Sequence, residues 1–367
     1  MTARSFDKLM VRALELAARG KGRVSPNPMV GAVLYKSSKV ISEGFHAGPG
    51  KPHAEIVALK KAGSQAKGGT LVVNLEPCCH TGRTGPCTEA IIEAGVKRVV
   101  YALKDPDPRV NGSGLRALKK AGVELIGPVL KKEAEELNQF YLASRKLGRP
   151  FVILKSAQTL DGQIATLSGD SKWISSAPTL KFGHQLRSEI DAIVVGGETV
   201  RRDNPELTVR RVKGRNPYRI VLTTDPESLD GSRLLKARDG KTVIASSKSA
   251  LVRFSKINSN QKLILWEIAT SGKKQLSLNS FVAQAHQFGF NSVLIEAGSK
   301  LATSFLKAEL VDKYLCLIAP KLIGEGKGSV GDLGLTQMAD AISFDNPTFQ
   351  PSGPDIIFTG YPRWRDK

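Results

Sequence analysis

Two neighbouring stretches decide the fold of the first half: residues 53–62 read HAEIVALKKA, and residues 70–95 read TLVVNLEPCCHTGRTGPCTEAIIEAG. The apolar spacing of the first stretch predicts a helix over 54–62. The second stretch predicts a strand over 70–75, a loop rich in glycine and cysteine, and a helix over 88–95. Strands that alternate with helices in this way are typical of an α/β domain.

The same alternation continues through the chain. In the first half we also expect a helix over 6–17, strands over 30–35, 39–46, 97–103 and 123–127, and helices over 113–122 and 133–148. Gly148-Arg149-Pro150 marks a boundary. Beyond it we expect strands over 151–157, 191–197, 218–224, 241–247, 262–268, 292–298 and 312–320, and helices over 177–189, 279–289 and 299–310. The sequence therefore predicts two α/β domains, residues 1–147 and 148–367, each with a mostly parallel, helix-covered sheet.

Length and composition are those of a globular protein. Of the 367 residues, 41% are hydrophobic and 24% are charged, which excludes a disordered chain, a collagen and a coiled coil. No run of about 18 apolar residues could span a membrane, and the charged N-terminal helix does not resemble a secretory signal, so we expect a cytoplasmic protein. The formal net charge of +20 favours anionic partners such as phosphorylated metabolites, nucleotide cofactors or nucleic acid.

The distribution of cysteine is more specific. The chain has four, Cys78, Cys79, Cys87 and Cys316, and the clustering of three of them indicates a metal or catalytic site rather than a disulfide framework. His53 and two of these cysteines would give Zn²⁺ three ligands and leave the fourth position for water. Glu55 could carry protons from such a water to a leaving amine. The alternative is a closed structural zinc site with Cys79 or His80 as the fourth ligand, and the His-x-Glu spacing argues against it.

Several motifs of the first half resemble those of one enzyme family. They are HAE at 53–55, EPCCHTGRTGPC at 76–87, PNPMVGAV at 26–33, GFH at 44–46 and DPDPRV at 105–110. Together they are similar to the deaminase half of the bifunctional deaminase/reductases of riboflavin biosynthesis. Cytidine and tRNA-adenosine deaminases typically have Cys-x-x-Cys, whereas eight residues separate the outer two cysteines of this cluster.

This resemblance implies a cytidine-deaminase-like three-layer domain with one Zn²⁺ per chain. The implied zinc ligands are His53, Cys78 and Cys87, and the implied catalytic proton shuttle is Glu55. The implied substrate contacts are Asn27, His46 and Arg83. The sequence departs from the family pattern at four positions, none of which changes the ligand set: Cys79 stands for Ser, Gly85 for Pro, Asp107 for Asn and Ser113 for a basic residue.

The second half carries further motifs of the same family: KSAQTLDG at 155–162, SGDSKWI at 168–174, GETVRRDNPELTVR at 197–210 and EAGS at 296–299. They imply a dihydrofolate-reductase-like domain that uses NADPH. The implied cofactor-binding residues are Ala157, Trp173, Thr199, Asp203, Thr224, Gly298, Ser299, Lys300, Leu301, Ala302, Thr303 and Ser304. The implied substrate-binding residues are Ser171, Arg187, Leu207, Arg210 and Glu296.

Taken without the resemblance, these residues support two interpretations. Glycines where strands 191–197 and 292–298 end could let backbone N–H groups meet phosphate, and the same glycines would also suit ordinary strand-to-helix turns. Trp173 could stack on a nicotinamide or belong to the core.

Two other features need separate interpretation. GKGSVG at 326–331 matches G-x-G-x-x-G, but no apolar-periodic helix follows it and no acid lies at the required distance, so we expect a glycine-rich loop near the site. Basic residues are dense over 201–219, yet Tyr218 is the one aromatic residue among them. This composition favours a ribose-phosphate clamp over a nucleic-acid surface.

The resemblance thus implies a bifunctional enzyme. The first domain would deaminate 2,5-diamino-6-(5-phosphoribosylamino)pyrimidin-4(3H)-one, and the second would reduce the ribosyl side chain of 5-amino-6-(5-phosphoribosylamino)uracil to ribityl. We expect a homo-oligomer whose partners are these substrates and NADPH, with no membrane or nucleic-acid partner. The competing hypotheses are a deaminase that edits nucleic acid and a non-catalytic regulator with a structural zinc site.

Overall fold

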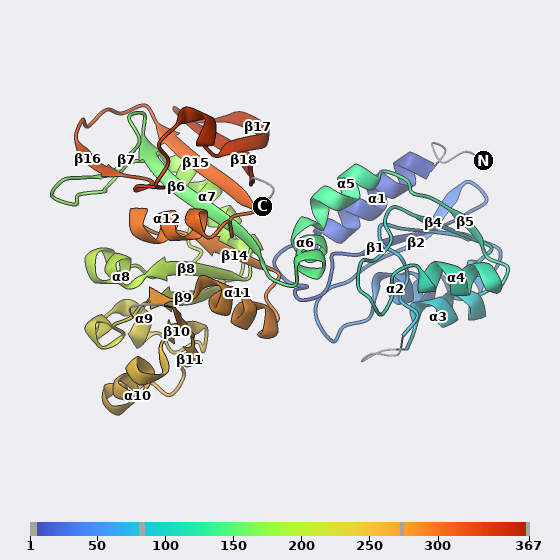
Figure 1. The fold of residues 1–367 in the computed structure, drawn as a ribbon. Coiled ribbons are helices and arrows are strands. Elements are labelled where there is room, and N and C mark those ends of the chain that lie inside the picture. The colour runs from blue at the N-terminus through green and yellow to red at the C-terminus, as the bar shows by residue number, and fades with distance from the viewer. Residues whose placement is uncertain (1–5, 81–84, 272–274, 365–367) are drawn as a thin grey trace. The chain divides into compact units, whose positions relative to one another are not determined.

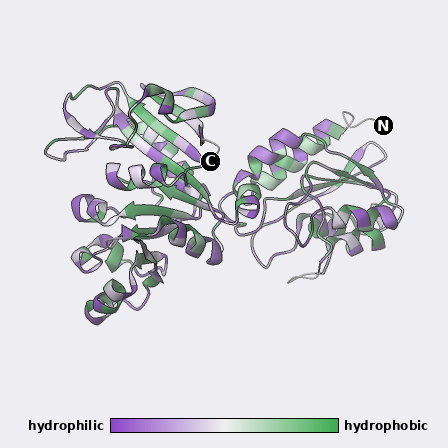
Figure 2. Cartoon of the chain, in the orientation of Figure 1, coloured by the Kyte–Doolittle hydropathy of each residue, from purple (hydrophilic) through white to green (hydrophobic). Residues whose placement is uncertain are grey.

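The computed structural model describes residues 6–80, 85–271 and 275–364. The chain forms two compact units, Met1–Gly148 and Arg149–Lys367, labelled by element in Figure 1. In each unit, hydrophobic residues concentrate on the strands, whereas the helices carry both hydrophobic and hydrophilic residues (Figure 2). Within the described ranges, no helix has the length and apolar character needed to cross a membrane.

The N-terminal unit is built on a five-stranded sheet in the order β2-β1-β3-β4-β5. Its strands are β1 (Gly31–Lys36), β2 (Lys39–Phe45), β3 (Thr70–Val73), β4 (Arg98–Tyr101) and β5 (Glu124–Ile126). β1 is antiparallel to both β2 and β3, whereas β3, β4 and β5 are parallel. The sheet is therefore mixed, and the expectation of a mostly parallel sheet was wrong for the β1–β2 edge, where a short turn joins the two strands.

Helices cover both faces of this sheet (Figure 1). They are α1 (Asp7–Ala18), α2 (Ala54–Ala62) with the 3₁₀ turn η2 (Gly63–Ala66), α3 (Cys87–Glu93), α4 (Ser113–Lys120), α5 (Lys131–Leu137) and α6 (Gln139–Leu147). One apolar cluster joins α1, α5 and α6 to Val33, Val72 and Val100. A second joins α2, α3 and α4 to Leu34, Leu71 and Val99. Because neighbouring strand residues point to opposite faces, these clusters give the three-layer architecture that was predicted.

Two glycines allow helices to lie directly on the strands. A Cβ atom at Gly44 would stand 2.2 Å from the carbonyl oxygen of Ala54, and one at Gly31 would stand 2.1 Å from that of Ala13. Real side chains do not approach a backbone so closely, so these positions require glycine. The first turn of α2 is thereby pressed against β2, which fixes the position of the HAE motif.

The C-terminal unit contains a nine-stranded sheet in the order β11-β10-β9-β8-β14-β6-β15-β18-β17. Its strands are β6 (Phe151–Thr159), β8 (Ala192–Gly196), β9 (Tyr218–Leu222), β10 (Thr242–Ser246), β11 (Ile264–Glu267), β14 (Ser292–Ile295), β15 (Lys313–Ala319), β17 (Ser343–Ser352) and β18 (Asp355–Arg363). The strands from β11 to β15 are parallel, and β18 and β17 add an antiparallel edge.

The remaining elements connect these strands. The helices are α7 (Ala177–Glu189), α8 (Gly197–Asp203), α9 (Arg233–Lys236), α10 (Lys248–Ile257), α11 (Leu278–Gln287) and α12 (Ser299–Lys307), and the 3₁₀ turns are η3 (Glu227–Leu229) and η4 (Met338–Asp340). Two short pairs complete the unit, β7 (Gln163–Thr166) with β16 (Gly326–Gly328) and β12 (Thr270–Ser271) with β13 (Gln275–Leu276). Phe281 of α11 and Phe305 of α12 join strand residues such as Val194 and Val293 in one core.

Several features depart from the predicted elements. The helix expected over 133–148 is divided into α5 and α6 at Asn138, whose side-chain amide accepts the N–H of Met29 at 2.8 Å and donates to its carbonyl at 2.9 Å. The β17–β18 hairpin, helices α9 and α10, and the short strands β7, β12 and β13 were not predicted. The segment 326–331, expected as a loop, contains the short strand β16.

Candidate active sites

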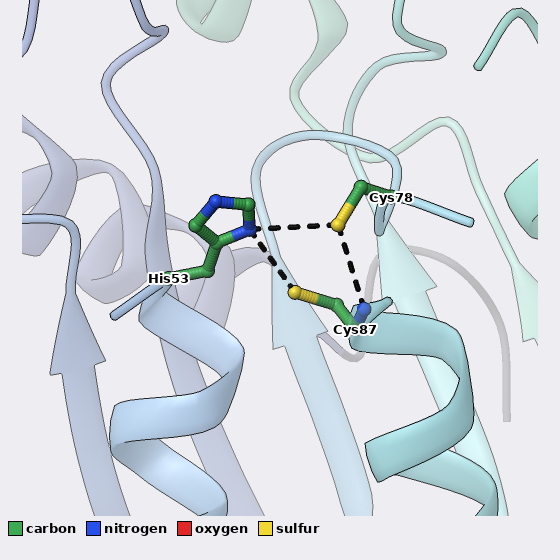
Figure 3. Close-up of side chains that lie close together, drawn as sticks. All are labelled: His53, Cys78 and Cys87. Carbon is green, nitrogen blue, oxygen red and sulfur yellow. Dashed lines mark hydrogen bonds between the residues drawn. The ribbon is translucent and has the colours of Figure 1, made fainter. Parts of the chain in front are cut away.

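The three predicted zinc ligands lie together in the N-terminal unit. His53 Nδ1 is 3.2 Å from Cys87 Sγ and 3.5 Å from Cys78 Sγ (Figure 3). All three ligand atoms lie within 4.8 Å of one another. Ligands bound tetrahedrally at zinc–nitrogen and zinc–sulfur bond lengths lie about 3.5 Å apart. The spacing of these atoms therefore fits one zinc ion.

Two of the ligands lie at the starts of helices, and the third lies in the loop after a strand. His53 is the residue before α2 and has an extended backbone. Cys78 follows β3, and Cys87 is the first residue of α3. The backbone N–H of Cys87 donates to Cys78 Sγ at 3.4 Å, and that of Thr88 donates to the Cys78 carbonyl at 3.1 Å. The two cysteines are thus brought together by the start of α3, although eight residues separate them in the sequence.

The three side chains change one another's pKa in different directions. Hydrogen bonds from Cys87 and His53 lower the pKa of the Cys78 thiol, which favours the thiolate that zinc requires. Hydrogen bonding to Cys78 raises the pKa of His53 and that of the Cys87 thiol, so these two groups would have to lose a proton when zinc binds. The donor set of one imidazole and two thiols is the set expected of a zinc-dependent deaminase.

Glu55 lies in the first turn of α2, two residues after the ligand histidine. Its side chain is buried, and its Oε2 has no hydrogen-bond partner among the described residues. Burial raises the pKa of Glu55 to about 7. A buried carboxyl oxygen without a partner is costly, and here it belongs to a side chain beside the candidate zinc ligands, as expected of a proton-transfer residue.

Two of the three predicted substrate residues are described in this unit. His46 is buried; its Nδ1 lies 3.1 Å from the carbonyl of Pro52, and its Nε2 lies 3.0 Å from Asn27 Nδ2. A neutral ring that donates from Nδ1 and accepts at Nε2 satisfies both contacts. Its ring also meets that of His53 edge-on, with centroids 5.5 Å apart. Arg83 lies outside the described residues.

The alternative zinc ligands are separate from this group. Cys79 is partly exposed, and its thiol points to the carbonyl of Arg109 at 3.9 Å. Neither Cys79 nor His80 belongs to the group of atoms that lie close enough to share a metal ion in the described part of the chain.

Sequence reasoning missed the role of Glu76, which precedes Pro77-Cys78. Its buried carboxylate accepts three backbone N–H groups: Oε2 from Gly112 at 2.9 Å and Asp105 at 3.2 Å, and Oε1 from Leu115 at 3.1 Å. It therefore holds the 105–115 segment against the cysteine loop. The EPC motif was visible in the sequence, but nothing there marked its distant backbone partners.

In the C-terminal unit, the predicted cofactor residues other than Trp173 lie near the points where the parallel strands end. Ala157 is on β6, Thr199 and Asp203 are on α8 directly after β8, and Thr224 lies two residues after β9. Residues 298–304 begin α12, which follows β14. Because β6, β14, β8 and β9 are consecutive in the sheet, their carboxyl ends share one edge, where α/β folds bind nucleotides.

Two of the three hydroxyl groups of α12 already donate hydrogen bonds to carbonyl groups of the same helix. Thr303 Oγ1 donates to the Ser299 carbonyl at 2.7 Å, and Ser304 Oγ donates to the Lys300 carbonyl at 2.9 Å. Ala302 is buried and Leu301 packs on the core. The N-terminal end of the helix, from Gly298 to Ser299, is therefore the part best suited to phosphate.

The structure excludes one of the two interpretations of Trp173. Its side chain is 68% exposed, so the core interpretation was wrong. It lies with Ser171 in the segment before α7, and its carbonyl accepts a hydrogen bond from Lys321 Nζ at 2.5 Å. An exposed indole beside a strand-end site can stack on a planar ligand.

Two predicted substrate residues form a buried pair. Arg187 Nε and Nη2 donate to the two oxygens of Glu296 at 2.9 and 2.8 Å. Lys155 Nζ, which sequence reasoning missed, lies 3.7 Å from the same carboxylate. Against the cost of burial, the charges of Arg187 and Lys155 lower the pKa of Glu296 to about 2. The cluster therefore carries two positive charges and one negative charge.

Arg210, the other predicted substrate arginine, lies in a more exposed environment than Arg187. Its Nη1 donates to Glu206 Oε2 at 3.0 Å and to Thr208 Oγ1 at 2.9 Å, and its side chain is 53% exposed. Its backbone N–H donates to His184 Nδ1 at 3.1 Å. Burial and the neighbouring arginines lower the pKa of His184 to about 4, so this imidazole is a neutral acceptor. Leu207 is buried and anchors the same segment.

Comparison with known proteins identifies the family. The RibD C-terminal domain matches residues 150–358, more than half of the chain, and the cytidine and deoxycytidylate deaminase zinc-binding region matches residues 4–103. The chain belongs to the RibD family. RibD proteins from Aquifex aeolicus and Escherichia coli are 41% and 37% identical to it, over 96% and 95% of this chain and 98% and 96% of their own lengths. The family predicted from the motifs is therefore confirmed.

Solved structures of RibD proteins share the fold of the whole chain. RibD from Acinetobacter baumannii matches with a TM-score of 0.88 at 33% identity, covering 99% of this chain and 100% of that one. A Thermotoga maritima protein, described as a diaminohydroxyphosphoribosylaminopyrimidine deaminase/5-amino-6-(5-phosphoribosylamino)uracil reductase, matches with a TM-score of 0.84 at 36% identity, covering 98% and 99%. These RibD structures confirm the predicted fold class, a cytidine-deaminase-like domain followed by a reductase domain.

Proposed function

We propose that this chain catalyses two steps of riboflavin biosynthesis, a zinc-dependent deamination in residues 1–147 and an NADPH-dependent reduction in residues 148–367. The observation that carries the proposal is the group His53, Cys78 and Cys87 beside the buried carboxyl of Glu55, whose Oε2 has no hydrogen-bond partner among the described residues. Its occurrence in a member of the RibD family favours this function over nucleic-acid editing and over a non-catalytic regulator.

The first reaction replaces the 2-amino group of 2,5-diamino-6-(5-phosphoribosylamino)pyrimidin-4(3H)-one by oxygen and releases ammonia. Zinc held by His53, Cys78 and Cys87 would supply a water activated at neutral pH. Glu55 accepts a proton from the attacking water and delivers it to the leaving amine. Asn27 would contact the substrate, and His46 holds its amide in place, with Asn27 Nδ2 at 3.0 Å from His46 Nε2.

The second reaction reduces the ribosyl group of 5-amino-6-(5-phosphoribosylamino)uracil to ribityl. NADPH would supply the hydride. The start of α12 offers backbone N–H groups to its phosphates, and Trp173 offers an exposed aromatic face. Arg187, held by Glu296, and the more exposed Arg210 would bind the substrate phosphate by charge-assisted hydrogen bonds.

Incubation with the diaminopyrimidine tests both steps when products are followed by mass spectrometry. Without NADPH, we expect the amino group to be replaced by oxygen and the reaction to stop there. With NADPH, we expect the further gain of two hydrogens. Conversion in neither condition by zinc-loaded, folded protein would refute the proposal, and a product with the second change but not the first would reverse the proposed order.

A further inference from the structure

The glycine-rich segment 326–331 matches G-x-G-x-x-G, but in the structure it contains the strand β16, which pairs with β7 in antiparallel fashion. We call residues 323–331 the strap, and all of them are among the described residues. The strap follows β15 and crosses from the turn between β6 and β7 to the first turns of α12.

One end of the strap is held by Asp161 of the TLDG motif. Asp161 Oδ2 accepts the N–H of Gly324 at 2.8 Å and that of Ile323 at 3.1 Å. The other oxygen, Oδ1, accepts the Thr159 hydroxyl at 2.5 Å. Both oxygens of this carboxylate are therefore used to join the strap to the turn after β6.

The other end is held by α12. The N–H of Gly331 donates to Thr303 Oγ1 at 2.7 Å, and the same hydroxyl donates to the Ser299 carbonyl at 2.7 Å. A Cβ atom at Gly331 would stand 3.2 Å from Thr303 Oγ1 and 3.3 Å from Ser299 Oγ. The strap therefore lies against the two hydroxyl-bearing residues at the start of the helix, and glycine permits the contact.

These contacts bear on the function of Thr303. Its side chain is 8% exposed, and its hydroxyl already donates one hydrogen bond and accepts another. It is poorly placed to serve as a direct phosphate ligand. Ser299 lies one turn earlier, at the first position of α12, and its hydroxyl lies next to Gly331 of the strap.

We propose that the strap is a fixed part of the NADPH site and that Thr303 and Asp161 are positioning residues at its two ends. By holding the β6–β7 turn and the start of α12 at a set spacing, they keep the phosphate-binding end of the helix ready for the cofactor. This inference rests on the proposed reductase function. Its physical basis is that a site ordered before binding does not lose affinity to the ordering of its own loops.

The test uses the full chain and direct binding of NADPH. Thr303→Val keeps the shape of the side chain but removes the hydroxyl, and Thr303→Ser keeps the hydroxyl. Loss of a neutral hydrogen bond corresponds to a change of about 2- to 12-fold in an equilibrium constant. We therefore expect Thr303→Val to raise the dissociation constant of NADPH by about that factor, with faster hydrogen exchange in 323–331, and Thr303→Ser to behave as wild type.

Asp161→Ala separates positioning from direct contact, because it releases the strap at the end away from Thr303. We expect it to weaken NADPH binding as well, and the double variant to be weakened by less than the product of the two effects. Gly331→Ala, which should displace the strap without changing α12, should act in the same direction. A matched control is Ser255→Ala, which removes a hydroxyl that donates to the Leu251 carbonyl at 2.8 Å on α10.

The thermal unfolding midpoint of the C-terminal unit reports whether each variant is folded. Wild-type affinity for NADPH in Asp161→Ala and Gly331→Ala, together with weakened binding in Thr303→Val, would overturn the proposal in favour of direct contact by Thr303. If Ser255→Ala weakened NADPH binding as much as Thr303→Val, the proposal would also be overturned, because loss of any helix hydroxyl would then have the same effect. Failure of the wild-type chain to bind NADPH would instead refute the proposed function, so the two failures are distinguishable.

Discussion

Replacement of Glu76 by glutamine tests whether one buried carboxylate holds the 105–115 segment against the cysteine loop of the deaminase domain. Glu76 Oε2 accepts N–H groups from Gly112 and Asp105, and Oε1 accepts that of Leu115. Glutamine has nearly the same shape, but one oxygen becomes an NH₂ donor. In either orientation of the amide, at least one backbone N–H then faces another donor.

The structure sets the expected magnitude. The orientation that loses least keeps the amide oxygen at Gly112 and Asp105 and gives up the bond from Leu115. A hydrogen bond to a charged group contributes about 1.5–3 kcal/mol. Since about 1.4 kcal/mol corresponds to a factor of ten, the amide of Leu115 should exchange with solvent about ten- to a hundredfold faster when local opening controls exchange.

Hydrogen–deuterium exchange read on peptides that cover 105–115 provides the assay. The matched control is Glu124→Gln, because Glu124 pairs with Arg98 at the surface with its side chain 48% exposed, where ion pairs contribute about 0–1 kcal/mol. We expect deaminase activity to fall in Glu76→Gln while reductase activity is kept. Unchanged protection of 105–115 in Glu76→Gln would refute the reasoning, because the three hydrogen bonds would then not be what orders the segment.

Three further outcomes follow from the same sites. Cys79→Ser should keep one zinc per chain by elemental analysis and Cys78→Ser should lose it; the reverse pattern would exchange the two cysteines in the ligand set. Glu55→Gln should lower the deaminase rate by about 10²–10⁴-fold, while the reductase rate on chemically prepared deaminated substrate stays at the wild-type value; joint loss of both in folded, zinc-loaded protein would contradict separate sites. Arg210→Ala should raise the reductase KM by about 10- to 100-fold, with partial recovery in Arg210→Lys, which lacks the planar fork; unchanged kinetics would contradict its placement on the substrate phosphate.

The metal site could be predicted from sequence because its signals are local. His53 and Glu55 are two residues apart on one helix start, and the cysteines share one loop. Glu76 could not be assigned in this way, since its partners are backbone N–H groups 29 to 39 residues away. Every residue except proline has a backbone N–H, so the sequence does not show which of them will donate to a distant carboxylate.

The pair formed by Arg187 and Glu296 shows an intermediate case. Both were predicted as substrate residues, but they are 109 residues apart, and only the order of the sheet brings α7 to the end of β14. The resemblance implied that both are substrate residues, whereas the structure shows that they also pair with each other. Because Lys155 faces the same carboxylate, the cluster keeps a net positive charge that would attract a phosphate.

Two of the unpredicted elements were missed for different reasons. Helix α10 carried a usable signal, since Ser247 accepts the N–H of Ala250 as a helix cap and Ala250, Leu251 and Phe254 form its buried face. The β17–β18 hairpin was obscured by proline, which is uncommon within strands. Pro347 lies in the irregular stretch between Asp345 and Thr348, and Pro351 lies on the outermost strand of the sheet; bulges and edge strands are the places where sheets tolerate proline.

Both candidate sites use the start of a helix that follows a strand. In the N-terminal unit, Cys87 begins α3, and its backbone N–H donates to Cys78 Sγ, so the helix start stabilises the sulfur as a thiolate. In the C-terminal unit, α12 begins after β14 and presents its N–H groups where the cofactor phosphates are expected. In each case backbone groups that the helix leaves unpaired are available to a negative charge. The two proposed chemistries would therefore depend on the position of these helix starts as well as on named side chains, and Gly44→Ala and Gly331→Ala, which shift a helix or its cover, should impair them.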